Sequence, residues 1–367
     1  MQVLRRLLLP FSLLYGAVIY VRNYLYDSGK MKSSTFSVPV ISIGNITTGG
    51  TGKTPLVEYL IRLLKNDFRI ATLSRGYGRK TKGYIQAQFP TDTTQIGDEP
   101  MQYLTKFKDV IVIVSEDRTE GIEKLIHREN PPQVILMDDA YQHRKVVPGL
   151  SLLLLEYDTI FQNDFLLPAG NLREPKSSIN RANIIVITKS PNILVPIERK
   201  RILETIKPGK DQIVFFSFVK YGEFNRIFAE QNMMQMGAGY YLEKRFTILL
   251  VTGIANPSGM IEYLRRHTDK LEILIFPDHH EFSTKDLNKI LQTFDNIVNP
   301  SKIIVTTEKD AMRLKNPDIK DISKKLPVFF LPIEVHFHQE GEKFNNLILE
   351  YVRTNQANSR IHTRKNN

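Results

Sequence analysis

Residues 40–55 read Val-Ile-Ser-Ile-Gly-Asn-Ile-Thr-Thr-Gly-Gly-Thr-Gly-Lys-Thr-Pro, and this stretch decides the fold. Its apolar start predicts a buried strand, its small residues predict a loop, and the apolar periodicity from Thr54 to Leu64 predicts a helix. A polyphosphate is held by backbone N–H groups that point inward, and glycines leave that backbone unobstructed. Lys53 would then bring charge to the terminal phosphates, and the Thr54 hydroxyl would ligate Mg²⁺. The predicted nucleotide-binding loop comprises Thr47, Thr48, Gly49, Gly50, Thr51, Gly52, Lys53 and Thr54.

One position departs from the general phosphate-loop pattern, because Thr47 stands where that pattern has its first glycine. The alternative interpretation is an ordinary Gly/Thr-rich connection between a strand and a helix. We favour nucleotide binding because a strand precedes the loop, an amphipathic helix follows it, and an acidic partner for Lys53 occurs further along the chain.

The bulk composition limits the function classes. A length of 367 residues suits two domains. The absence of cysteine excludes disulfides, thiolate metal sites and cysteine nucleophiles. A formal charge of +11 suits an anionic partner, although a solvated basic surface accounts for part of it. The chain has no zinc-finger spacing, aromatic RNA-binding motif or heptad array, so we expect no nucleic acid partner.

The N-terminal segment, residues 1–27, is apolar between Leu7 and Val21 and basic at Arg5, Arg6 and Arg22. This run is shorter than the ~20 residues that a membrane-spanning helix needs, and no small-residue cleavage site of a signal peptide follows it. Two alternatives remain, a helix on a membrane surface and a helix in a groove of the protein. The flanking arginines and tyrosines favour the membrane surface.

A second strand at residues 67–73 completes a β-α-β unit, which requires a parallel sheet. Ligands of such sheets bind at the carboxyl ends of the strands. Two loops at predicted strand ends carry Arg75 and Arg118, and each is also explicable as a simple turn. Between them, Asp98 and Glu99 begin a helix, where acids more often interact with the helix dipole than act in catalysis.

The strand predicted at residues 133–137 ends in Asp138 and Asp139 and is followed by Gln142 and His143. In phosphate-loop enzymes an apolar strand that ends in acid holds the magnesium shell of the β- and γ-phosphates. Buried carboxylates without a cation are unfavourable. We therefore predict that these aspartates are the partners of Lys53 at a nucleotide and Mg²⁺ site.

Further strands are predicted at residues 152–156 and 184–189. Between them, the turn-rich stretch 166–175 contains Arg173 and Glu174, which we interpret as an oriented charge pair on a loop. From about Val214 to Lys244 the alternation is lost, and the methionines and glycines of 233–239 suggest a mobile connection. The predicted division is 28–213 for a phosphate-loop domain, 214–245 for a connection and 246–367 for a second, smaller α/β domain.

The second domain contains the motif Asp278-His279-His280 after a predicted strand. Some phosphoesterases bind metals with a similar triplet, but they need further ligands, and the chain has only eight histidines. A histidine beside a carboxylate is better suited to oriented acid–base chemistry. We therefore favour an acid–base role for this motif.

Taken together in order, these motifs resemble one family over nearly the whole chain, the tetraacyldisaccharide 4'-kinase (lipid A 4'-kinase) family of Gram-negative bacteria. The variant residue Thr47 fits that family, whereas the stretch 222–244 is longer than its usual interdomain connection. The motifs that carry the resemblance are Ser42–Asn45 with Gly49–Thr54, Ser74–Gly78, Gly97–Pro100, Asp138–His143, Leu167–Gly170 with Leu172–Pro175, Asp278–His280 and Thr307–Asp310.

The resemblance implies an α/β fold with a P-loop NTPase-like parallel sheet, and a kinase that uses ATP and Mg²⁺. It implies that the acceptor is the 4'-hydroxyl of an acylated glucosamine disaccharide 1-phosphate, at the cytoplasmic face of the bacterial inner membrane. Asp98 would be the base and His279, rather than His280, the residue that orients it. The other implied residues are Thr54, Glu99, Asp138 and Asp139 around Mg²⁺, and Arg75, Arg118, Gln142, His143, Arg173 and Glu174 near substrate or phosphate.

A second hypothesis, from a different class, is a membrane-attached nucleotide-dependent switch or scaffold that transfers phosphate to no small acceptor. The pair of Asp98 and His279 has no evident use in a switch, so we rank this hypothesis lower. Nucleotide-dependent binding of a partner would support the switch, whereas for the kinase we infer no obligate protein partner.

Overall fold

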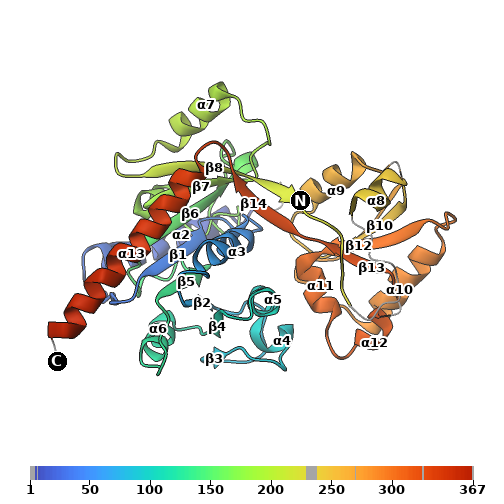
Figure 1. Ribbon diagram of the computed structural model, residues 1–367. Helices are drawn as coiled ribbons and strands as arrows, with labels where there is room; N and C mark the ends of the chain where they lie inside the picture. Colours follow the sequence, from blue (N-terminus) through green and yellow to red (C-terminus); the bar gives the residue numbers. More distant parts are fainter. Residues whose placement is uncertain (1–4, 6, 229–237, 269, 325, 366–367) are drawn as a thin grey trace.

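The computed structural model describes residues 5, 7–228, 238–268, 270–324 and 326–365 (Figure 1). These residues form two sheets, one of nine strands and one of five, each with helices packed against it. The order of the larger sheet is β14-β8-β7-β6-β1-β5-β2-β4-β3, and that of the smaller is β11-β10-β12-β13-β9.

The larger sheet has β1 near its centre, and all six residues of β1 are buried. Pairing is parallel from β8 to β4, whereas the edge strands β3 and β14 run antiparallel. Its strands are β1 (Val40–Asn45), β2 (Ile70–Ser74), β3 (Ile85–Gln86), β4 (Ile111–Val114), β5 (Val134–Asp138), β6 (Leu150–Glu156), β7 (Ile184–Thr188), β8 (Ile213–Tyr221) and β14 (Ile333–Phe337).

The helices of this unit pack apolar faces on the sheet. Leu56, Leu60 and Leu64 of the helix after the phosphate loop are fully buried, at the spacing of one helical face. The helices are α2 (Leu9–Asp27), α3 (Lys53–Leu64), α4 (Thr93–Ile96), α5 (Asp98–Lys106), α6 (Arg118–Ile126), α7 (Pro196–Ile206) and α13 (Gly341–Lys365), with short 3₁₀ turns η1 (Tyr157–Thr159) and η2 (Lys176–Arg181).

The smaller unit has its own core, which includes Leu250, Ile303 and Phe329. Ser283 and Asp286 form a capping box that fixes the start of α10. The strands are β9 (Asn225–Arg226), β10 (Thr247–Thr252), β11 (Leu271–Ile275), β12 (Lys302–Thr307) and β13 (Val328–Leu331), and the helices are α8 (Ala238–Glu243), α9 (Ser258–Arg265), α10 (Thr284–Asp295), α11 (Glu308–Leu314) and α12 (Lys320–Ser323).

The division between the units differs from the predicted one. Residues 214–221, expected in the connection, belong to β8, and residues 333–365, expected in the second domain, form β14 and α13 on the first. The pairing of β8 with β14 joins segments far apart in the sequence, such as Val219 with Val335, so local periodicity does not reveal it. Residues 229–237, which include the methionines of the expected mobile stretch, lie outside the described residues.

Helix α2 presents two different faces. Ser12 and Ile19 are buried, the Ser12 Oγ donates to the Leu166 carbonyl at 2.9 Å, and Arg22 pairs with Glu174 at 2.6 Å. Apolar side chains on the rest of the helix are exposed, namely Phe11, Leu13, Leu14, Val18 and Val21. Within the part of the chain that the structure describes, no helix is both long and apolar enough to cross a membrane. The helix therefore docks on the protein and leaves an apolar surface uncovered.

A close approach at Gly44 gives a test of the packing under the phosphate loop. A Cβ at this position of β1 would lie 2.6 Å from the Tyr141 Cβ and 2.8 Å from its backbone nitrogen. We expect Gly44→Ala to lower the free energy of unfolding by about 1–3 kcal/mol, because a packed core does not accept an extra methyl group. Urea unfolding measures this loss, and Gly50→Ala is the control, since a Cβ there has no atom within 4 Å. Equal stability of the two variants would contradict the close packing at Gly44.

Candidate active site

The phosphate loop is built as the sequence predicts, between the end of β1 and α3. Gly49 and Gly52 have φ angles of 102° and 88°, which only glycine adopts freely. The loop is fixed from outside, because the Thr48 N–H donates to the Asn171 carbonyl at 2.7 Å and the Thr188 hydroxyl donates to the Thr51 carbonyl at 2.8 Å. Thr47 pairs as an isolated β-bridge with Leu172, an extended conformation that does not need glycine.

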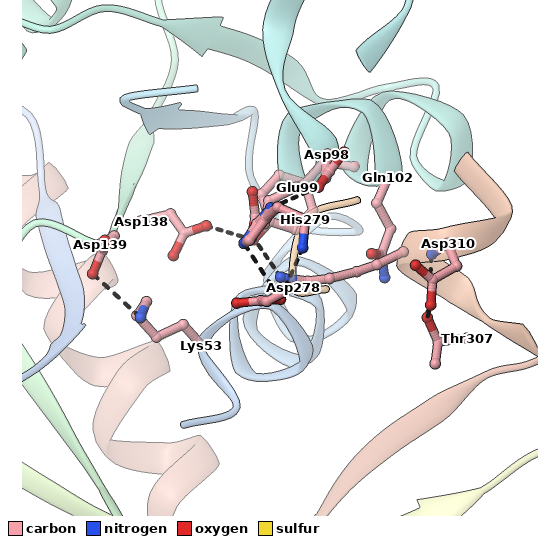
Figure 2. Close-up of polar contacts among 12 residues, drawn as sticks. Lys53, Asp98, Glu99, Gln102, Asp138, Asp139, Asp278, His279, Thr307 and Asp310 are labelled. Carbon is pink, nitrogen blue, oxygen red and sulfur yellow. Dashed lines mark hydrogen bonds and ion pairs between the residues drawn. The ribbon is translucent and has the colours of Figure 1, made fainter. Parts of the chain in front are cut away.

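Lys53 faces the acidic end of β5, as expected (Figure 2). Its Nζ lies 3.3 Å from Asp139 Oδ1, and Arg173 Nη1 lies 2.9 Å from Asp139 Oδ2. Burial by itself would raise the pKa of Asp139, but Lys53 and Arg173 outweigh it and lower that pKa. The structure thus places Asp139 beside Lys53, as the sequence predicts. Arg173 contacts Asp139 and not Glu174, the partner that the sequence analysis expected for it.

Asp138 is buried, and only one of its carboxylate oxygens has a partner. Tyr103 donates its hydroxyl to Asp138 Oδ2 at 2.8 Å, whereas Oδ1 has no hydrogen-bond partner. Burial, together with the neighbouring Glu99 and Asp139, raises the pKa of Asp138 to about 6. A buried carboxylate oxygen without a donor is unfavourable unless a cation meets it.

The residues present fit a magnesium ion bound mainly through nucleotide. Mg²⁺ keeps several waters and phosphate oxygens and takes only one or two carboxylates from the protein, and Asp138 Oδ1 beside the phosphate loop suits it. Among the described residues, no three His, Cys, Asp or Glu side chains form a cage for a metal ion. Glu99, expected near the ion, is a neighbour of Asp138 and pairs with Lys309 at 2.5 Å.

Asp98 and His279 meet across the two units (Figure 2). Asp98 is the first residue of α5, His279 follows β11, and His279 Nδ1 lies 2.9 Å from Asp98 Oδ2. His279 adopts a φ of 57°, a left-handed conformation that is strained for this residue, and the Tyr77 ring packs edge-on against it at 4.9 Å. Burial would raise the pKa of Asp98, but hydrogen bonds from His279 and Arg313 outweigh it and lower the pKa to about 2.

The neighbouring histidine is placed elsewhere. His280 stacks on Phe276 and its Nε2 lies 3.1 Å from Asp286 Oδ2, so it interacts with its own unit and not with Asp98. The choice between the two histidines, which the sequence alone leaves to resemblance, thus has a geometric basis. A cavity adjoins Asp98 and His279, lined also by Tyr77, Thr93 and Asn316.

The other residues expected near substrate or phosphate differ in their surroundings. Gln142 supports the loop by donating to the Asn45 carbonyl at 2.7 Å, and Arg75 is exposed at the end of β2. Arg118 is buried and donates to the Ser115 carbonyl at 3.0 Å. Burial, together with the positive charge of Arg118, lowers the pKa of His143 to about 4. Glu174 differs from the expectation of a substrate-lining residue, because its carboxylate is completely buried between Arg22 and Arg181.

Two cations from α11 are the residues that the sequence prediction missed. Lys309 contacts Glu99, and Arg313 contacts Asp98 with two of its nitrogens. The motif Thr307–Asp310 indicated this helix, and Arg313 lies one turn beyond Asp310, its partner at 2.8 Å. The spacing of three residues between Asp310 and Arg313, which places both on one face of a helix, was the only sequence pattern that pointed to Arg313.

Comparisons with known proteins give this geometry a family. Residues 4–353 match the profile of the family described as LpxK, tetraacyldisaccharide-1-P 4'-kinase. The chain belongs to this family. Curated relatives named tetraacyldisaccharide 4'-kinase include one from Bacteroides fragilis, 45% identical over 98% of this chain and 96% of the relative, and one from Flavobacterium johnsoniae, 45% identical over 97% of this chain and 99% of the relative.

A solved structure agrees. The crystal structure described as the "apo" form of LpxK from Aquifex aeolicus in complex with ATP aligns with a TM-score of 0.72 and 33% identity, over 95% of this chain and 99% of that one. The predicted family, the α/β P-loop fold and the enzyme class are therefore confirmed. The chain is an ATP-dependent kinase of lipid A biosynthesis that phosphorylates the 4'-hydroxyl of an acylated disaccharide 1-phosphate.

In this kinase a buried polar cluster joins the two units behind the site. Gln102 of α5 donates to Glu58 of α3 at 2.7 Å and to Glu308 of α11 at 3.0 Å. Lys106 pairs with the same two carboxylates at 2.7 and 2.8 Å. Burial raises the pKa of Glu58 to about 7, with a further contribution from Glu308, against the lowering effect of Lys106 and Arg62.

This cluster predicts a pH dependence of stability. The pKa of Glu58 is raised from 4.5 to about 7 in the folded state, so its contribution to stability is complete below pH 4.5 and is lost as the pH rises toward 7. We expect Glu58→Gln, which does not ionise, to gain about 1–3 kcal/mol relative to wild type between about pH 4.5 and about pH 8. Denaturant unfolding over this range measures the difference, with the exposed Glu262→Gln as control. A constant difference between wild type and Glu58→Gln would refute the raised pKa.

Proposed function

We propose that this kinase transfers the γ-phosphate of ATP to the 4'-hydroxyl of its acylated glucosamine disaccharide 1-phosphate with Asp98 as the proton acceptor. The observation that carries the proposal is the contact of Asp98 with His279, at 2.9 Å and from the two different units. A sugar hydroxyl must lose its proton as its bond to phosphorus forms, so a base has to lie at that oxygen.

The proposed roles of the remaining residues follow from their places. Gly49–Thr54 would hold the β- and γ-phosphates by backbone N–H groups, with Lys53 on the terminal phosphates. Thr54, Asp138 and Asp139 would hold Mg²⁺, which when bound supplies charge neutralisation at the β- and γ-oxygens. Arg173, which already contacts Asp139, would contribute further positive charge.

A base with a low pKa is compatible with this reaction. Asp98 stays ionised over the physiological range because its pKa is lowered to about 2. In the loose transition states of phosphoryl transfer the hydroxyl proton leaves late, so a base that is weak in the ground state suffices. Because His279 and Asp98 belong to different units, approach of the units would assemble this pair and exclude water from ATP.

We also propose that the kinase binds the cytoplasmic face of the inner membrane through α2, without an obligate protein partner. The exposed apolar side chains of α2 would enter the lipid interface, and the exposed Arg5 lies just before the helix begins. The buried pairs of Glu174 with Arg22 and Arg181 would keep the helix attached to the catalytic unit.

The role of Asp98 is tested by Asp98→Asn. We expect kcat to fall by about 10²–10⁴-fold, because the amide accepts no proton, while the Kd for ATP stays within about twofold. Radiolabelled γ-phosphate transfer to the acylated disaccharide in detergent micelles measures the first, and calorimetry the second. The control is Asp295→Asn, on the exposed end of α10. Near wild-type transfer by the Asp98→Asn enzyme would remove Asp98 from the role of base.

The contribution of α2 to membrane binding is tested by the double change Phe11→Asp and Leu14→Asp, at side chains that are 61% and 67% exposed. Loss of about 1.5–3 kcal/mol of burial per side chain predicts a reduction in vesicle binding of at least about tenfold. Co-sedimentation with anionic phospholipid vesicles measures it. Val298→Asp, 97% exposed in the second unit, is the matched control. Unchanged sedimentation of the α2 variant would contradict the proposed attachment.

A further inference from the structure

Arg313 of α11 makes the most extensive contact with Asp98. Its Nε and Nη2 lie 2.9 and 2.6 Å from the same oxygen, Asp98 Oδ2, and its side chain is 5% exposed. His279, the other partner of this oxygen, is 28% exposed. The more buried partner of Asp98 is therefore the arginine and not the histidine.

Arg313 is itself held rigidly within the second unit. Its Nη1 donates to the Gly253 carbonyl at 2.9 Å and to Asp310 Oδ1 at 2.8 Å. Asp310 is completely buried and accepts from the Thr307 hydroxyl at 2.7 Å and from the Gly253 N–H at 3.0 Å. The guanidinium is thus fixed before it reaches Asp98, as a planar fork with few alternative positions.

These contacts make the two oxygens of Asp98 inequivalent. Oδ2 accepts from Arg313 Nε, Arg313 Nη2 and His279 Nδ1, which must carry a proton to donate to a carboxylate. The 3.4 Å approach of Arg313 Nη2 to His279 Nδ1 therefore joins two donors and is not a hydrogen bond. Among the described residues, none donates to Oδ1. Three donors saturate Oδ2, which leaves Oδ1 as the oxygen available to a substrate proton.

We infer that Arg313 is a positioning residue of the phosphoryl transfer, which fixes the Asp98 carboxylate so that Oδ1 faces the acceptor hydroxyl. The inference rests on the proposed function, in which Asp98 is the base. Arg313 touches no reacting atom and acts only through Asp98. Because Arg313 and His279 both come from the second unit, the base is oriented only when the units are together. Thr307 and Asp310 of the motif Thr307–Asp310 then have a defined role, which is to hold Arg313.

The competing explanation is that Arg313 simply joins the two units. A structural ion pair and a positioning residue both lose activity when the arginine is removed, so a single substitution does not separate them. A double-mutant cycle shows whether Arg313 acts through Asp98, because its loss then has little further effect once the carboxylate is replaced. Unfolding midpoints complete the test, since a residue that only joins the units lowers the midpoint together with kcat, whereas a positioning residue lowers the kcat of an enzyme that unfolds near the wild-type midpoint.

The cycle compares wild type, Arg313→Gln, Asp98→Asn and the double variant by radiolabelled phosphate transfer. We expect Arg313→Gln to lower kcat by about 10²-fold, with the KM for ATP within about twofold. In the Asp98→Asn background we expect the same change to lower kcat by less than about threefold. The control is Arg266→Gln, which removes an exposed arginine paired with Glu262 and leaves kcat unchanged.

Two further measurements, chemical rescue of Arg313→Ala and the activity of Arg313→Lys, distinguish loss of the guanidinium from loss of folding. Guanidinium ion at tens of millimolar should restore transfer by Arg313→Ala and have no effect on Asp98→Asn. Arg313→Lys should recover only part of kcat, because an ammonium does not reproduce the two-nitrogen contact. Thermal unfolding midpoints show which variants are folded before kinetics are compared.

Three results would overturn the inference. They are a wild-type kcat for Arg313→Gln, losses that multiply fully in the double variant, and a folded Arg313→Ala enzyme that guanidinium does not rescue. A different result, near wild-type transfer by Asp98→Asn alone, would remove the proposed base itself. Failure of the positioning role and failure of the proposed function are thus separate outcomes.

Discussion

The structure depends on a carboxylate that is buried between two units and is neutralised by only one of them. Asp98 belongs to the nucleotide-binding unit, but the groups that hold it charged, Arg313 and His279, belong to the other. A buried charge without partners is strongly unfavourable, so separation of the units has an electrostatic cost that their contact removes. The same contact orients Asp98, the proposed base, only when both units are together. Stability of the interface and competence of the site are therefore linked through one side chain.

A second set of contacts connects α2 with the nucleotide site. The loop 166–174 packs against α2 through Leu166 and Glu174, and against the phosphate loop through Asn171 and Leu172. Arg173 in the same loop contacts Asp139, which in turn contacts Lys53. Glu174 thus anchors α2 to the first unit, although the family resemblance implied a place near substrate or phosphate. The docked face of α2 and the exposed apolar face serve different purposes on one helix.

Three helices meet behind the site, and each brings an ionisable group to the interface. Glu58 comes from the phosphate-loop helix α3, Lys106 from the helix that begins with Asp98, and Glu308 from the helix that carries Arg313. Through these side chains, the helix after the phosphate loop is joined to the helices that carry Asp98 and Arg313. Burial, together with the neighbouring Glu308 carboxylate, raises the pKa of Glu58 to about 7, although Lys106 and Arg62 act to lower it.

The sequence by itself determined the phosphate loop, the parallel sheet and the acidic strand end at Asp138 and Asp139, because each depends on contiguous residues with a fixed local geometry. It also determined the family, because the family motifs are short contiguous stretches in a fixed order. Thr47, which replaces the first glycine of the general phosphate-loop pattern, could be identified from the sequence as a variant of that pattern. In the structure Thr47 forms an extended bridge with Leu172, a conformation that does not need glycine. Only the tertiary structure decided that β8 and β14 pair in the first sheet, that His279 rather than His280 meets Asp98, that Glu174 is buried, and that Arg313 contacts Asp98. Each of these depends on contacts between residues far apart in the chain, and such contacts cannot be predicted from local periodicity or composition.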